Sequence, residues 1–389
     1  MPPTALPAQQ GVGAAGSAGN PPAAVVPFSQ ASNLGLEQGP SFTFTPTAAQ
    51  QTFGPYPLPA TGYLRRVLIE AVGAGGTGGT GLADYPASIF ALIRLTDTNG
   101  APIYELSGYN TLLADTYGGY AGVPDWRADP DYSAATTGSN IEPYVPLEID
   151  ASGMGSPANL SASSAYRLTV IGDTLTNTYS VSPSPVPTYT CTVWMDYWTL
   201  PNTVDGSGRQ QAITPPYPGT LQLWSQQPNV TVNAGANRIP LNRMGNLLRT
   251  ILIVNKAAGA RSESTIADPV TLRWDDINLQ VVDRRTIRKR MREYLNDLTA
   301  RDTGVYVIGQ YNHGTSRLAG GISVVSWLPT VSATRYELST PAGGGAGGTL
   351  DWIINDVSVA STAPQQRATV GGTGVQFHPP VAPVIPGTT

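Results

Sequence analysis

The sequence has very few of the residues that build metal sites and nucleophilic centres. Its 389 residues include one cysteine, Cys191, and two histidines, His313 and His378. An intrachain disulfide and a cysteine-cluster metal site are therefore excluded. Cys191 shares one face of an alternating run with Val193 and Met195, so we predict a core thiol rather than a nucleophile.

Charged residues and long apolar runs are also scarce. Only 12% of the residues are charged and the formal net charge is -4, so no overall basic character attracts nucleic acid. No apolar run is long enough to predict a transmembrane helix. Residues 1–36 lack the basic start and apolar centre of a signal peptide. They carry no charged side chain, and neither do residues 368–389 apart from His378. We predict an extended N-terminal arm over 1–36 and an extended C-terminal tail over 368–389.

Glycine and proline, by contrast, are abundant. The chain has 43 Gly and 35 Pro, and both residues interrupt long helices. Short strands joined by tight turns are therefore favoured. Hydrophobic residues make up 41% of the chain, which is enough to build cores and argues against wholesale disorder.

One order of elements occurs twice along the chain. Residues 247–298 contain an apolar run, a small-residue loop, two alternating runs around a turn, and a helical pattern. Residues 64–117 contain the same order, and Leu64-Arg65 matches Leu248-Arg249 184 positions later. We therefore predict two versions of one domain over 37–205 and 220–367, joined by a linker over 206–219.

Each predicted domain offers seven or eight strands and one short helix. In the first domain the helical spacing covers residues 109–117. In the second, Asp283 is a plausible N-cap for a helix with an apolar stripe from Ile287 onward. We therefore predict an all-β fold: two tandem antiparallel β-sandwiches, each with a short flanking helix.

Motifs for cofactors and catalysis are absent or incomplete. Residues 73–78 formally match G-x-G-x-x-G, but they run into another strand with no room for the helix that dinucleotide binding requires. No P-loop, nucleophile elbow or zinc-protease motif is present. Asp125, Asp129 and Asp131 lack the spacing of a calcium loop. We expect no cofactor, no metal site and no catalytic residue.

The most basic segment of the chain lies in the second predicted helix. Its cations are Arg284, Arg285, Arg288, Lys289, Arg290 and Arg292. One interpretation is a solvated helix face balanced by Glu293, Asp297 and Asp302. Another is a surface that pairs with acidic groups of a neighbouring subunit, or with a polyanion such as anionic lipid or nucleic acid. A solvated face, a subunit contact and a polyanion contact therefore all remain open for this helix.

The whole chain resembles a known family. Residues 64–69 with 103–117, residues 248–253 with 277–298, and the later runs 304–308 and 334–338 carry the resemblance. They are similar to the double jelly-roll major capsid proteins of membrane-containing tailless phages, the tectivirus type. The resemblance is one of architecture and length over nearly the full chain, and it makes each sandwich a jelly roll.

The resemblance implies a homotrimer that tiles an icosahedral virion shell after assembly in the host cytoplasm. Its expected partners are neighbouring trimers, minor capsid and vertex proteins, and the surface of an internal membrane. Sequence-specific nucleic acid is not expected, and the family brings no catalytic residues.

Two other classes stay open. A carbohydrate-binding or receptor-binding β-sandwich protein would need an aromatic platform, for which Trp126, Tyr132 and Trp198 are candidates. A glycoside hydrolase would need two convergent carboxylates, for which Glu142, Glu148 and Asp150 are candidates.

Overall fold

The structure is a computed structural model that describes most of the chain between residues 25 and 358. The described ranges are 25–58, 62–97, 100–117, 127, 129–146, 166–214, 221–240, 247–257, 260–295, 302–309, 328–329, 335–342 and 348–358. The chain divides into two compact units, Met1–Asn33 with Pro201–Pro215 and Leu34–Leu200 with Pro216–Thr389. No helix in these ranges is long and apolar enough to cross a membrane. The predicted tail over 368–389 lies outside them.

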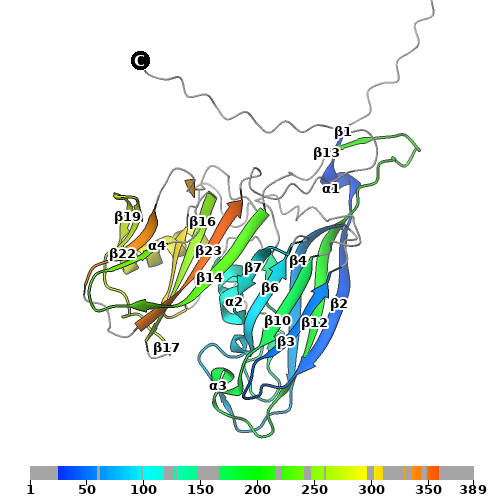
Figure 1. Ribbon diagram of the computed structural model, residues 1–389. Helices are drawn as coiled ribbons and strands as arrows, with labels where there is room; N and C mark the ends of the chain where they lie inside the picture. The colour runs from blue at the N-terminus through cyan, green and yellow to red at the C-terminus, as the bar shows by residue number, and fades with distance from the viewer. Residues whose placement is uncertain are drawn as a thin grey trace, which may run out of the picture. The chain divides into compact units, whose positions relative to one another are not determined.

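The larger unit begins with a sandwich of two antiparallel sheets, which we call the first sandwich (Figure 1). One sheet has the order β2-β12-β4-β8, with β9 also paired to β4, and the other has the order β3-β10-β6-β7. The bounds of these strands are β2 Leu34–Phe44, β3 Gln51–Pro57, β4 Gly62–Ala74, β6 Phe90–Thr96, β7 Pro102–Leu106, β8 Asn140–Ile141, β9 Tyr144–Pro146, β10 Arg167–Gly172 and β12 Thr188–Thr199. Smaller elements are β5 Thr80–Gly81, β11 Tyr179–Val181, the 3-10 helix η1 Ala87–Ile89 and α3 Leu175–Thr178.

The second sandwich repeats this plan. Its sheets have the orders β14-β23-β16 and β15-β22-β18-β19, and β17, β20 and β21 also pair with β16. The bounds are β14 Leu221–Val232, β15 Asn237–Pro240, β16 Leu247–Ala257, β17 Ala260–Arg261, β18 Val270–Trp274, β19 Ile277–Val282, β20 Val305–Gly309, β21 Leu328–Pro329, β22 Tyr336–Thr340 and β23 Gly348–Ser358. The order β2-β12-β4 with β3-β10-β6-β7 therefore matches the order β14-β23-β16 with β15-β22-β18-β19, as the predicted duplication requires.

Aromatic side chains fill the space between the sheets of the first sandwich. Phe42 on β2 stacks on Phe53 on β3, with ring centroids 4.6 Å apart. Phe44, two residues along β2, lies 6.1 Å from Phe90 on β6 by the same measure. Both β2 rings alternate with exposed neighbours, as the period of a strand with one face on a core requires.

A β-bulge explains the short sequence match between the two copies. Along β12, Asp196 pairs with Arg66 and the next residue pairs with Leu64, so Arg65 is the extra residue of β4. Along β23, Asn355 pairs with Thr250 and the next residue pairs with Leu248, so the extra residue of β16 is the arginine between them. A bulge kinks a strand at a fixed place, and this one stands at the same place in both sandwiches.

The registers that surround the bulge also align β2 with β14. Leu36 pairs with Asp196, and its counterpart Trp224 pairs with Asn355. Continuing from there, Gln38-Gly39-Pro40 corresponds to Gln226-Gln227-Pro228, in which the first and third residues are identical. Both ladders are irregular at this point, because proline has no N–H to donate to a ladder. The sequence contains this second match, which our sequence reading missed.

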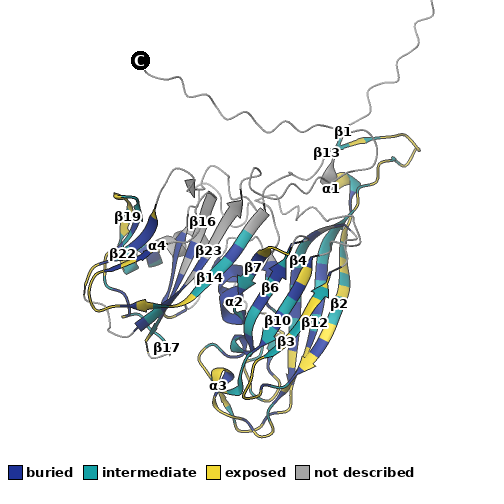
Figure 2. Cartoon of the chain, viewed as in Figure 1, coloured by how far each residue is buried: buried dark blue, intermediate teal, exposed yellow. Residues whose placement is uncertain are grey.

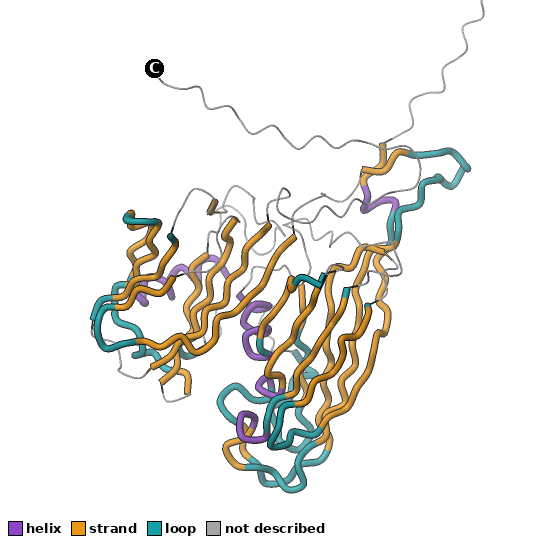
Figure 3. Tube along the Cα trace, in the orientation of Figure 1, coloured by secondary structure: helices purple, strands orange, loops and turns teal. Residues whose placement is uncertain are grey.

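The helices occupy matching places too (Figure 3). α2 (Gly108–Tyr117) follows β7, and α4 (Arg284–Leu295) follows β19. Ser107 Oγ accepts the Asn110 N–H at 3.3 Å, and Asp283 Oδ1 accepts the Thr286 N–H at 2.6 Å. Each is an N-cap in the ordinary sense, so the predicted cap at Asp283 is confirmed. Counting back from the caps makes Tyr104 the counterpart of Gln280.

The helix α2 differs from its prediction. The spacing of residues 109–117 predicts one apolar face, yet every residue of α2 is buried, including Asp115. The reason is that α2 contacts β6, β7 and β9 of the first sandwich and also β16 of the second. The spacing of apolar residues predicts the face that packs on the first sandwich, but it does not predict the contact with the second.

The described part of the predicted N-terminal arm is not simply extended, because it pairs with the described part of the predicted linker. Strand β1 (Val25–Pro27) pairs in parallel with β13 (Ala212–Thr214), and α1 (Phe28–Ala31) follows β1. Residues 34–36 belong to β2, so the first sandwich begins before the predicted boundary at residue 37. The two segments supply each other's backbone hydrogen bonds, a pairing that we did not predict from the sequence.

Candidate functional site

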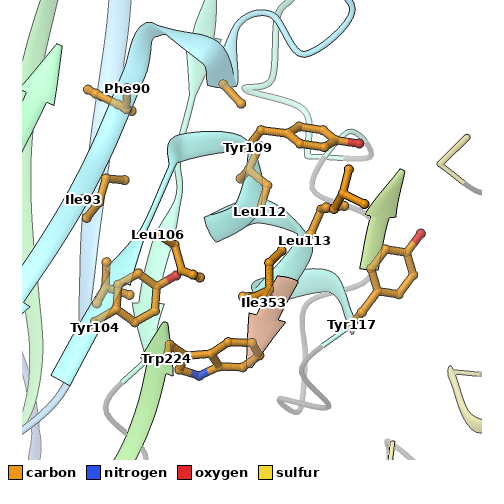
Figure 4. Close-up of a cluster of buried hydrophobic side chains, with 14 of the residues drawn as sticks. Phe90, Ile93, Tyr104, Leu106, Tyr109, Leu112, Leu113, Tyr117, Trp224 and Ile353 are labelled. Atoms are coloured by element: carbon orange, nitrogen blue, oxygen red, sulfur yellow. The ribbon is translucent and has the colours of Figure 1, made fainter. Parts of the chain in front are cut away.

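The two sandwiches meet where β7 of the first pairs in parallel with β14 of the second. Trp224 lies opposite Tyr104, and Ser225 lies opposite Glu105. This pairing joins two sheets into one of ten strands among the described residues. Figure 4 shows Trp224 and Ile353 beside Tyr104 and Leu106, next to α2. Trp224 is only 1% exposed. We call this contact the junction.

A glutamine on β14 reaches across the junction to the start of α2. Gln226 Oε1 accepts the backbone N–H of Ser107 at 2.9 Å and the side-chain amide of Asn110 at 2.7 Å. The first N–H groups of a helix have no partner within the helix itself. Gln226 therefore satisfies a backbone donor next to the cap of α2 while it fixes the register of the junction.

A buried carboxylate forms the polar centre of the same contact. Asp302, whose side chain is 1% exposed, precedes β20 in the second sandwich. It accepts hydrogen bonds from Tyr109 at 3.3 Å and Tyr117 at 3.1 Å, both on α2. It also pairs with Arg127 at 3.0 Å and Arg261 at 3.1 Å. A buried carboxylate needs such partners to offset its desolvation.

The titration behaviour of this centre suits a structural role. Burial raises the pKa of the Tyr109 and Tyr117 hydroxyls, and the charge of Asp302 raises them further. Both hydroxyls therefore keep their protons and remain donors. Burial also raises the pKa of Asp84, against the opposing charge of Arg261, which lies 2.8 Å away.

The basic helix α4 has two kinds of cation. Arg284 pairs with Asp268 at 3.0 Å. Arg288, one turn further on, pairs with Glu263 and donates to the Tyr306 hydroxyl at 3.3 Å. These two arginines are engaged within their own sandwich. Their partners are not the acidic residues that the sequence suggested, since Asp302 serves the junction instead.

Of the other four cations of the basic cluster, two are exposed and two have side chains that the structure does not describe. Arg285 and Lys289 are exposed and lie one turn apart on α4. The side chains of Arg290 and Arg292 belong to the part of α4 whose side chains are not described. The contact that α4 could make through its exposed cations stays a prediction, now centred on Arg285 and Lys289.

The other sequence candidates do not form a catalytic or metal site in the described ranges. Cys191 is fully buried, and burial raises its pKa, which suits a core thiol. No helix begins within residues 73–78, where Gly75, Gly76 and Gly78 have positive φ. No group of three potential metal ligands occurs among the described residues. His313 and His378 lie outside those ranges.

The carbohydrate and glycosidase candidates are only partly described. Glu142 lines a small pocket with Tyr132, and burial first, then Asp129, raises the pKa of Glu142. Trp198 lies on β12 and does not line that pocket. Trp126, Glu148 and Asp150 lie outside the described ranges. Asp115 and Asp129 line the pocket with Glu142, so the carboxylates gathered there are not the set that the sequence suggested, and Trp198 does not join Tyr132 in an aromatic platform.

Comparison with solved structures identifies the architecture. The MCP of STIV, the Sulfolobus Turreted Icosahedral Virus, matches with a TM-score of 0.57 and 12% identity, over 86% of this chain and 99% of that one. The PBCV-1 virus capsid matches with a TM-score of 0.55 and 14% identity, over 84% and 94%. The major capsid protein P2 from bacteriophage PM2 matches with a TM-score of 0.50 and 10% identity, over 85% and 99%.

The fold is a double jelly roll. The solved structures that match it are double jelly-roll major capsid proteins, and the fold class expected from the sequence is confirmed. No family model matches the sequence, and no curated protein matches it. At 10–14% identity the likeness rests on the path of the chain.

Proposed function

We propose that this protein is the major capsid protein of an icosahedral virus and that its role is structural rather than enzymatic. One observation carries the proposal: the fold matches the MCP of STIV over 86% of this chain and 99% of that one, and the major capsid protein of PM2 over 85% and 99%. The junction supports it, because Asp302 and Trp224 hold two sandwiches of one chain together as a single building block.

The proposed unit of assembly is a homotrimer in which three chains place six sandwiches in a ring. Such trimers would tile the virion shell, beside minor capsid and vertex proteins and over an internal membrane. The similar structures come from a Sulfolobus virus and from a bacteriophage. The proposal therefore extends to icosahedral viruses and is not limited to phages.

The low charge of the chain suits assembly of this kind. With 12% charged residues, few ionic groups would have to lose water at each contact between subunits. Closed symmetry repeats each contact many times, so weak contacts become strong together. The charge-free residues before β1 would act in contacts between trimers.

The test is the mass and assembly of the purified full-length chain. Light scattering after size-exclusion chromatography should give three times the chain mass, and electron microscopy at high concentration should show closed shells. A chain lacking residues 1–24 should remain a trimer but form no closed shells. A full-length chain that stays monomeric at every concentration would contradict the proposal.

A further inference from the structure

Two strands of the larger unit have a free edge with exposed apolar side chains. β19 ends the sheet β15-β22-β18-β19, and β2 ends the sheet β2-β12-β4-β8, so each pairs on one side only among the described strands. Ile277, Leu279 and Val281 are exposed on β19, and Leu34 and Leu36 are exposed on β2 (Figure 2). Exposed apolar edges of this kind are sites where another strand adds.

β19 is the counterpart, in the second sandwich, of β7, whose edge is already covered by another strand. β7 holds the same place in the first sandwich, and there β14 covers it. The bulge residue of β7 is Ile103 and that of β19 is Leu279. Ile103 is 2% exposed, whereas Leu279 is 36% exposed. The same strand position is therefore buried where a neighbour is present and open where none is.

β2 is the counterpart, in the first sandwich, of β14, the strand that covers β7. Trp224 of β14 is buried in the junction, and its counterpart on β2 is Leu36, which is 67% exposed. Gln226 accepts the backbone N–H of Ser107, the N-cap of α2, and its counterpart Gln38 is exposed. The junction joins β7 to β14, and the chain repeats both strands as β19 and β2. β19 and β2 do not pair with each other.

We propose that β2 of one chain adds in parallel to β19 of a second copy of the same chain. The register of the junction then places Leu36 beside Gln280 and Glu37 beside Val281. Gln38 reaches the backbone N–H of Asp283 at the start of α4, as Gln226 reaches Ser107 at the start of α2. The contact deepens the proposed trimer and rests on it, because it states which edges join its subunits.

The second copy is the occupant that the structure favours. Among the described strands, β19 offers a receiving edge and β2 a donating edge, and these two match a pair that already fits within the chain. A contact between different patches on identical chains is head-to-tail, and it must either close into a ring or continue as a filament. The proposed trimer is the closed case, in which three copies of this contact alternate with three copies of the internal junction.

The test is a disulfide between the two edges in the full-length protein. Leu36→Cys and Gln280→Cys in one chain should form covalent dimers and trimers on oxidation, because neighbouring strands lie about 4.8 Å apart. The native Cys191 is buried. The matched control is Ser41→Cys with Gln280→Cys, since Ser41 lies five residues further along β2, roughly 16 Å away.

The mass of the unoxidised variant, measured by light scattering, separates the outcomes. A trimer that cross-links through both cysteines, at least tenfold faster than the control pair, supports the contact. A trimer that cross-links no faster than the control overturns the contact and leaves the proposed function standing. A monomer that gives no covalent multimer overturns both. Gln38→Ala offers a second measurement: it should raise the trimer dissociation constant while Gln38→Glu, which keeps an acceptor, restores much of the loss.

Discussion

The two sandwiches have one plan and differ in what covers their edges. In the first, β7 is covered by β14 and α2 is buried on every side. In the second, β19 has no second partner among the described strands, and α4 carries exposed cations. The same strand order, bulge and helix cap therefore occur once in a closed setting and once in an open one. The difference shows which features belong to the fold and which belong to contacts between sandwiches.

The caps illustrate the same difference in chemistry. Ser107 is a neutral cap whose own backbone N–H is taken by Gln226. Asp283 is a charged, exposed cap beside Arg284 and Arg285. Either residue type satisfies the first turn. The choice of a serine fits a buried helix start, where a charge would lose its water.

The largest effect should come from the residue that fills the junction. Trp224→Ala removes a fully buried ring and should lower the free energy of unfolding by about 3 to 5 kcal/mol. Its counterpart change, Leu36→Ala, should cost less than about 0.5 kcal/mol in the isolated chain because Leu36 is exposed. Urea unfolding of both variants at low protein concentration measures this. Equal losses would contradict the assignment of a closed and an open edge.

The next largest effect concerns the polar centre of the junction. Asp302→Asn removes the carboxylate that Arg127 and Arg261 share, although Arg261 keeps Asp84. The change should cost about 2 to 3 kcal/mol, since both arginines keep some solvent. The control is Glu105→Gln, which breaks the half-exposed pair with Arg94 and should cost less than about 1 kcal/mol. Thermal unfolding compares them. If Asp302→Asn leaves the thermal stability unchanged, Asp302 does not hold the sandwiches together.

A smaller effect separates the two faces of α4. Arg288→Glu places a second carboxylate beside Glu263 and should lower the unfolding free energy by about 1 kcal/mol. Reversal of Arg285 and Lys289 together should leave that free energy nearly unchanged and should reduce trimer or shell formation. Parallel unfolding and light-scattering experiments decide between them. If the double reversal leaves assembly intact, the exposed cations form only a solvated face.

The smallest effect is a pH dependence that only the second sandwich should show. The hydrogen bond from the Thr286 N–H lowers the pKa of Asp283. A lowered folded pKa means that the charged cap stabilises the fold above the unfolded pKa, and this contribution is lost as pH falls through the folded pKa. Asp283→Ser copies the cap of the first sandwich. Its thermal midpoint should lie below that of the natural chain at neutral pH, and the difference should vanish in acid.

Much of the fold could be predicted from the sequence because its signals are local. Alternation in β2, the cap at Asp283 and the order of elements around Leu64 and Leu248 all act within a few residues. The junction could not be predicted in the same way. Asp302 reads as one acidic residue near a basic helix, and its four partners stand far from it in the sequence.

The sequence does contain one signal for the junction, the repeated short run at residues 38–40 and 226–228. The match between Gln38-Gly39-Pro40 and Gln226-Gln227-Pro228 is short, and nothing in the sequence marks its first residue as a hydrogen-bond acceptor for the start of another helix. Only the registers of β12 and β23 show that these residues stand at the same place in two sandwiches. Comparison of the repeats then connects the closed junction with the open edges.

The measurement that tests this account most directly is an electron cryomicroscopy map of the purified assembly at a resolution that separates strands. The account predicts three chains in a ring of six sandwiches, with β2 of each chain lying parallel to β19 of the next and Leu36 beside Gln280. A ring in which β19 faces solvent would contradict the account, and so would a ring in which β2 pairs with any other strand.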